Sequence, residues 1–225
     1  MKSGNCVQVA GGMLLAIGLI VFAGFATRVP RVQAQNQKEE DESSRVRVGF
    51  AVNPVHLELK GKDRNLVGLG SYLVNAVGSC NDCHAVNEYV AGYNPYFGQP
   101  KKIDSTDYLG GGRDFGSFGP GAPDIISRNL TPDKTGLPEG GHTFSEFRQI
   151  MRTGIDLDHL HPSCSATVTT NCLPPPFDGS RLQVMPWPIY QSMTDRDLQA
   201  IYEYLSAIPC YAGPPAPSPL HNDCE

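Results

Sequence analysis

Two cysteines and a histidine stand close enough to act on one cofactor in the run Cys80-Asn81-Asp82-Cys83-His84. A C-x-x-C-H run is the attachment pattern of haem c, in which both thiols join the porphyrin and the histidine faces the iron. A zinc site would need a second ligand pair, and no other close Cys or His pair fits well. A thiol redox pair would need a βαβ setting, which is missing. The run therefore predicts one covalently bound haem c, with Cys80 and Cys83 as anchors and His84 as an iron ligand.

A second axial ligand must come from elsewhere in the chain. The candidates are the remaining histidines and the methionines Met151, Met185 and Met193. Met185 lies in the run VMPWP, where the prolines keep the backbone extended, as a loop must be to hold a thioether over an iron. Met151 and Met193 lie on or beside expected helices and are more simply core residues. We therefore predict Met185 as the second ligand.

These ligands favour an electron carrier over an enzyme. A thioether opposite a histidine raises the potential of the iron, and two filled axial positions leave no place for a substrate. Two alternatives need a displaceable sixth ligand: a haem enzyme of the peroxidase type, and a haem module that binds a gas such as CO. Rapid CO binding to the reduced protein would indicate one of these alternatives.

The N-terminus has the pattern of an export signal. Lys2 precedes an apolar stretch over residues 7–26, and a small-x-small pattern ends at Ala34. Two arginines follow the apolar stretch, which is unusual for a cleaved signal, and the stretch approaches the length that spans a bilayer. We therefore expect residues 1–34 to be a signal peptide or an N-terminal membrane anchor. Either one places the remainder in the periplasm, as a soluble protein or anchored to the inner membrane.

Charge and cysteine content agree with export. The chain has 18 basic and 23 acidic residues, and the formal charge of −5 becomes −8 without residues 1–34. Such a surface disfavours nucleic acid and favours protein partners. An oxidising compartment lets the remaining cysteines pair, and of three possible pairings we prefer the local ones, Cys164 with Cys172 and Cys210 with Cys224.

Three helices are expected, at residues 66–79, 143–154 and 194–208. Leu66, Leu69 and Leu73 recur at helical spacing, and Thr143 with Glu146 forms a capping box. Residues 92–141 are rich in glycine and proline and are expected to form loops, and no convincing strand series appears. The fold class expected is all-α with long loops.

Residues 66–84 and 184–209 resemble bacterial class I (mitochondrial-type) monohaem cytochromes c, through MPW-x-x-Y and MTDRDLQAIYEYLSAIP. They are similar especially to the cytochrome subunits of periplasmic dehydrogenases, as is the segment 128–154. The resemblance implies cytochrome c-like helices around one haem, His84 and Met185 as axial ligands, and terminal helices that cross near Gly70. It also implies redox partners: a dehydrogenase as donor, and an oxidase or another cytochrome as acceptor. The chain would then be a free carrier or a non-catalytic subunit of an oxidoreductase complex.

The expected division of the chain follows from these patterns. It comprises the signal or anchor (1–34), a flexible polar leader (35–60), a cytochrome c domain (61–209) and a Pro-rich, disulfide-stapled tail (210–225). Asn129, Trp187 and Arg113 are candidate donors to the carboxylates of a haem, although turn formation by itself explains Asn129. A polar cluster that begins at Asp156 is more simply a solvated loop than a metal site.

Overall fold

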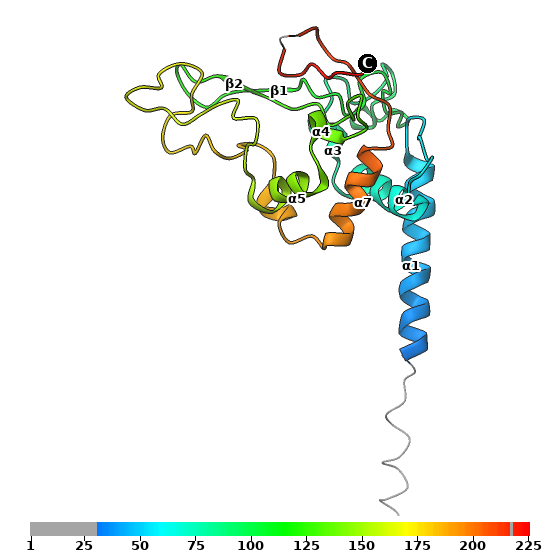
Figure 1. Cartoon of the computed structure of the whole chain (residues 1–225). Helices are drawn as coiled ribbons and strands as arrows, with labels where there is room; N and C mark the ends of the chain where they lie inside the picture. Colours follow the sequence, from blue (N-terminus) through cyan, green and yellow to red (C-terminus); the bar gives the residue numbers. More distant parts are fainter. Residues whose placement is uncertain (1–30, 217) are drawn as a thin grey trace, which may run out of the picture. The chain divides into compact units, whose positions relative to one another are not determined.

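The computed structural model describes residues 31–216 and 218–225, and the side chains from residue 39 onward. The chain divides into two compact units, Met1–Asp41 and Glu42–Glu225, and the apolar core lies in the second. The elements appear in Figure 1: α1 (Arg31–Val52, which begins in the first unit), α2 (Arg64–Tyr72), a π-helical turn (Leu73–Val77), α3 (Cys80–Cys83), a 3₁₀ turn (Pro95–Phe97), β1 (Asp114–Ser117), β2 (Asp124–Ile126), α4 (Pro138–Gly141), α5 (Phe144–Thr153), α6 (Trp187–Tyr190) and α7 (Asp195–Leu205).

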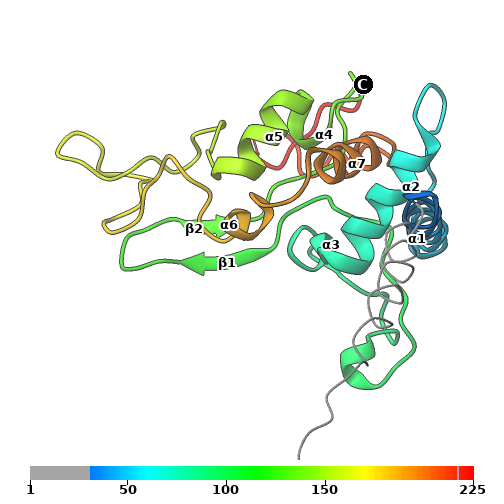
Figure 2. The same ribbon diagram turned by 90° about the horizontal axis from the view of Figure 1, so that it is seen from below.

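Helices α2 and α7 form the centre of the core, and they lie against each other in both views (Figures 1 and 2). Asp63 caps α2 by accepting hydrogen bonds from two backbone N–H groups of its first turn, and Thr194 caps α7. The helices approach closely because Gly70 has no side chain where the backbone of Ala200 passes. The apolar faces that they bury include Leu66, Val67, Leu69, Leu198, Ile201 and Leu205.

Helix α5 adds the third side of this core. Its capping box of Thr143 and Glu146 is present as predicted, and Gly154 ends it in the left-handed conformation. Phe147 and Met151 are buried against the core. The local signals in the sequence therefore placed α5 correctly.

The prediction of an all-α, cytochrome c-like fold is wrong. Within the predicted loop region 92–141, β1 and β2 pair as a two-stranded antiparallel sheet. Asp114 lies opposite Ile126 and Ser117 opposite Asp124, and the register is irregular between these two pairs. The described residues form the long helix α1, shorter helices, this hairpin and long loops, and they do not show helices arranged around a haem. The strands have four and three residues, too few for the alternation by which a strand is recognised in a sequence.

Residues 35–60, for which the sequence predicts a flexible polar leader, lie partly in a helix. Helix α1 covers this range as far as Val52, and Val46 and Phe50 on it pack beside Gly68 of α2. After α1, Leu57 and Leu59 are partly buried against the core. A few apolar side chains within a polar stretch thus hold it to the domain, while the division into domains remains a prediction.

The expected signal or anchor falls almost wholly outside the described residues, since 1–30 are not described. Within 31–216 and 218–225, no helix has both the length and the apolar character needed to cross a bilayer. Cleavage after Ala34 stays a prediction.

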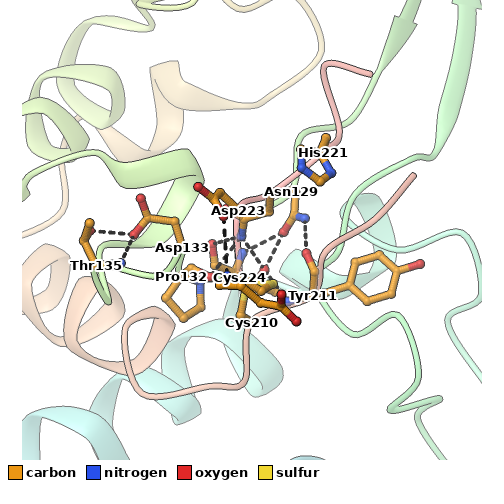
Figure 3. The surroundings of a disulfide bond; sticks show 12 residues. Asn129, Pro132, Asp133, Thr135, Cys210, Tyr211, His221, Asp223 and Cys224 are labelled. Carbon is orange, nitrogen blue, oxygen red and sulfur yellow. Dashed lines mark hydrogen bonds between the residues drawn. A yellow bond between two sulfur atoms is a disulfide. The ribbon is translucent and has the colours of Figure 1, made fainter. Parts of the chain in front are cut away.

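Both predicted disulfides are confirmed, Cys164–Cys172 and Cys210–Cys224. Figure 3 shows the second, which joins the two ends of the C-terminal tail next to the turn that follows Asn129. The Asn129 side chain donates a hydrogen bond of 2.8 Å to the carbonyl of Tyr211. The tail, which has few apolar residues, is therefore held mainly by a covalent link and by polar contacts.

Candidate functional site

The C-x-x-C-H run follows α2 directly. The π-helical turn and Gly78 end the preceding helix, and Ser79 in the left-handed conformation (φ 49°) turns the chain into the single turn of α3. Asn81 is buried and accepts a hydrogen bond of 3.0 Å from the N–H of Leu109, which fixes α3 against the segment that contains Leu109. Cys80 and Cys83 are thereby held one helical turn apart.

A cavity of about 650 Å³ opens beside α3. This volume is within the range of sites for cofactors and drug-sized ligands. Cys80, Cys83, His84 and Met185 all line it. The rest of its wall is mostly apolar and comes from the π-helical turn, α5, α6 and α7, with Leu73, Val74, Phe147, Met151, Ile201 and Leu205 among the lining residues. The structure therefore brings together all four residues that the sequence singled out.

His84 is held in one orientation and one tautomer. Its Nδ1 lies 2.8 Å from the backbone carbonyl oxygen of Arg128, which can only accept, so Nδ1 carries the proton and donates it. Burial lowers the pKa of the imidazole, because the charged form is poorly solvated there. Nε2 is then the basic nitrogen, as a metal-ligating histidine requires.

Cys80 is partly buried and Cys83 is exposed, and the surroundings of both thiols favour the neutral form. Burial raises the pKa of Cys80 to about 12, with a further contribution from Cys83, and burial also raises the pKa of Cys83. A zinc site or a reactive thiol pair needs thiolates, which this environment disfavours. Every other cysteine from residue 31 onward is in a disulfide, whereas these two are free.

Met185 lies in an extended segment that is fixed on its C-terminal side. Its carbonyl accepts a hydrogen bond of 2.8 Å from the N–H of Trp187, and the indole of Trp187 donates to the carbonyl of Leu182 at 3.2 Å. The indole packs on Gly154, where a Cβ would collide with the ring. Trp187 thus anchors the segment from which Met185 reaches the cavity wall. An apolar cavity with two thiols, an oriented imidazole and a thioether on its wall fits haem c in its chemistry.

The three candidate donors to haem carboxylates are engaged elsewhere. Asn129 holds the C-terminal tail, Arg113 pairs with Glu88, and Trp187 bonds to a backbone carbonyl. None of the three lines the cavity. The structure therefore does not bring them together with the cysteines, His84 and Met185.

Asp156 is not the solvated loop residue that the sequence suggests. It is 5 % exposed and forms an ion pair with Arg128, which also pairs with Asp158. Its carboxylate further accepts hydrogen bonds from the three N–H groups of residues 158–160. Asp156 therefore fixes the residue whose carbonyl orients His84. Nothing in the local pattern marks this contact, because the two partners are 28 positions apart.

Glu139 is a residue of the cavity wall that the sequence did not reveal. It lies in α4, within a glycine-rich stretch for which the sequence predicts a loop. It is 8 % exposed, and its backbone is in the left-handed region at φ 54°. A lone glutamate between proline and glycine carries no sequence signal of burial.

Two curated proteins are similar to the chain, and both are named "Alcohol dehydrogenase (quinone), cytochrome c subunit". One is from Gluconacetobacter polyoxogenes and the other from Komagataeibacter europaeus, and each is 30 % identical over 144 residues. The chain is a distant homologue of dehydrogenase cytochrome subunits. The aligned part is 63 % of this chain and 22 % of each relative, so the chain spans about a fifth of the relatives' length. No family model and no solved structure matches. The similarity does not identify the chain as a class I monohaem cytochrome c, and that assignment remains a prediction.

Proposed function

We propose that the chain is an exported electron-transfer protein with one haem c, attached to Cys80 and Cys83 and ligated by His84 and Met185. One observation carries the proposal: these four residues line a single apolar cavity in which the tautomer of His84 is already set. The distant likeness to cytochrome subunits supports the same cofactor.

Different residues of the chain would have different roles at such a site. The carbonyl of Arg128 orients His84 and strengthens Nε2 as a donor, since a hydrogen bond at the far nitrogen raises ligand basicity. The anchored segment at Trp187 presents Met185, and the apolar side chains around it exclude water. A haem held by His84 and Met185 would supply a one-electron couple of raised potential.

The partners are proposed from the relatives. Those proteins are subunits of a quinone alcohol dehydrogenase by name. We therefore propose that this chain accepts electrons from a periplasmic dehydrogenase, as its non-catalytic subunit or as a free carrier. An oxidase or another cytochrome would be the acceptor.

The attachment is tested on the purified exported protein. A covalent haem c stays with the chain after acid–acetone extraction and gives a reduced spectrum typical of thioether-linked haem. A colourless protein, or one that loses all pigment on extraction, would overturn the proposal.

The sixth ligand is tested by Met185→Ala, with Met193→Ala as the matched control. Both methionines line the cavity and are partly buried. Axial ligands move the potentials of haem proteins over about 0.8 V, so Met185→Ala should lower the midpoint potential strongly and Met193→Ala only slightly. The reduced wild type should not bind CO rapidly. An unchanged potential in Met185→Ala would remove Met185 from the site.

A further inference from the structure

Glu139 is a buried carboxyl group without a full set of partners. Among the described residues, its Oε2 has no hydrogen-bond partner. A buried polar atom left unsatisfied costs about 1–3 kcal/mol, and a non-glycine residue in the left-handed region costs a similar amount. The protein therefore keeps Glu139 at this position against two unfavourable terms.

Glu139 belongs to the wall of the proposed haem site. Glu139 lines the main cavity together with His84 and Met185, and it also lines a smaller adjoining pocket of about 70 Å³. Any change of charge in the cavity acts on it through a wall of low polarity, where electrostatic interactions are strong.

The charged and titratable groups around Glu139 do not neutralise it. Arg128 borders the smaller pocket, but its charge is already balanced by Asp156 and Asp158. The remaining groups are His161 and Arg181 on the wall of the pocket, and Asp82, Tyr190 and the two cysteines on the wall of the main cavity. His84 lines both, and its Nδ1 donates to a carbonyl. Arg181 is 44 % exposed at its side chain and lies beside Asp178.

We propose that Glu139 binds one proton when the site is reduced and releases it on oxidation, so that the chain carries a proton with its electron. This inference rests on the proposed function. Reduction adds one electron from the donor protein and removes one positive charge from the cavity, which makes the anionic carboxylate less stable. One proton from water then restores the balance, and oxidation returns both.

The acidity of Glu139 supports this role near neutral pH. Burial raises its pKa from 4.5 to about 7, Arg128 opposes that rise, and Asp156 adds to it. The carboxyl is therefore divided between its two forms at neutral pH, where a small change in the charge of the cavity shifts the proton.

The test is the midpoint potential of the full haem-loaded chain between pH 5 and pH 9. The wild-type potential should fall as pH rises through the neutral range, because reduction must then take up a proton. Glu139→Gln is neutral at every pH, so its potential should be flat, equal to the wild type at low pH and above it at high pH. Glu139→Asp keeps an acid and should keep the slope, whereas the exposed control Glu58→Gln should match the wild type.

A second measurement tests the inference on the wild type in case Glu139→Gln does not fold. The reduced-minus-oxidised infrared spectrum of the wild type should contain a carboxylic acid carbonyl band that shifts in D₂O. Absence of this band from the wild type would overturn the inference.

A wild-type slope retained in Glu139→Gln would also overturn it, since the proton would then reside on His161 or on a carboxylate of the haem. A chain that binds no haem gives no potential at all. That result would refute the proposed function, so the two failures are distinguishable.

Discussion

Replacement of Gly70 by alanine tests the crossing of α2 and α7, on which the wall of the cavity depends. The new Cβ would lie 2.6 Å from the carbonyl carbon of Ala200 and 2.7 Å from the Cβ of Tyr204. These atoms belong to the backbone, or are fixed to it, in a helix whose inner face is buried. The two helices would therefore have to move apart.

The size of the effect follows from two opposing contributions. Overpacking of a core costs about 1–3 kcal/mol, and a clash with backbone belongs at the upper end of that range. Alanine in place of glycine gains about 1 kcal/mol of helix propensity. We therefore expect Gly70→Ala to lower the free energy of unfolding by about 2 kcal/mol, or Tm by about 4–8 °C for a domain of this size.

Gly68 on the same helix is the matched control. A Cβ there would lie 2.7 Å from side-chain atoms of Phe50 and Val46, which can rotate away. The gain in propensity is the same, so Gly68→Ala should stay within about 1 kcal/mol of the wild type. Denaturant unfolding of the haem-loaded proteins, followed by far-UV circular dichroism, gives both values. Equal stability of the two variants would refute the argument from backbone contact.

Two further substitutions test the polar core and the tail. Tyr204→Phe removes a buried hydroxyl that has three hydrogen-bond partners, Asn53 and Tyr108 at 2.8 Å and Asn75 at 3.2 Å. The substitution should cost about 1–3 kcal/mol in denaturant unfolding. Tyr96→Phe, at a position 76 % exposed, is its control and should change nothing measurable. Joint replacement of Cys210 and Cys224 by serine opens a link between positions 14 apart and should cost about 3 kcal/mol in the same assay. An unchanged unfolding midpoint would mean that polar contacts suffice to hold the tail.

Helices α5 and α7 and both disulfides could be predicted because their signals are local. Thr143 with Glu146 and Thr194 with Asp197 are capping pairs three positions apart, and such pairs form within one turn of helix. The disulfides join cysteines 8 and 14 positions apart. Closing so short a loop costs little chain entropy, which favours local pairing.

The hairpin of β1 and β2 could not be predicted for the opposite reason. Its strands are too short to show alternation, and their pairing is supported by distant contacts. Phe118 in the hairpin loop stacks on Phe177 at 4.7 Å between ring centroids. Figure 2 shows the hairpin beside the long segment between α5 and α6 that contains Phe177. A contact between residues 59 positions apart produces no pattern within a short stretch of sequence.

For the candidate site, the sequence by itself determined the C-x-x-C-H run, because Cys80, Cys83 and His84 lie within about one helical turn. It also marked Met185, through the prolines that follow it. Only the tertiary structure decided that these residues share one cavity, that the carbonyl of Arg128 sets the tautomer of His84, and that Glu139 is buried on the same wall. The physical reason is that burial and long-range hydrogen bonds depend on how the chain returns on itself, and residue types over a short stretch do not encode that path.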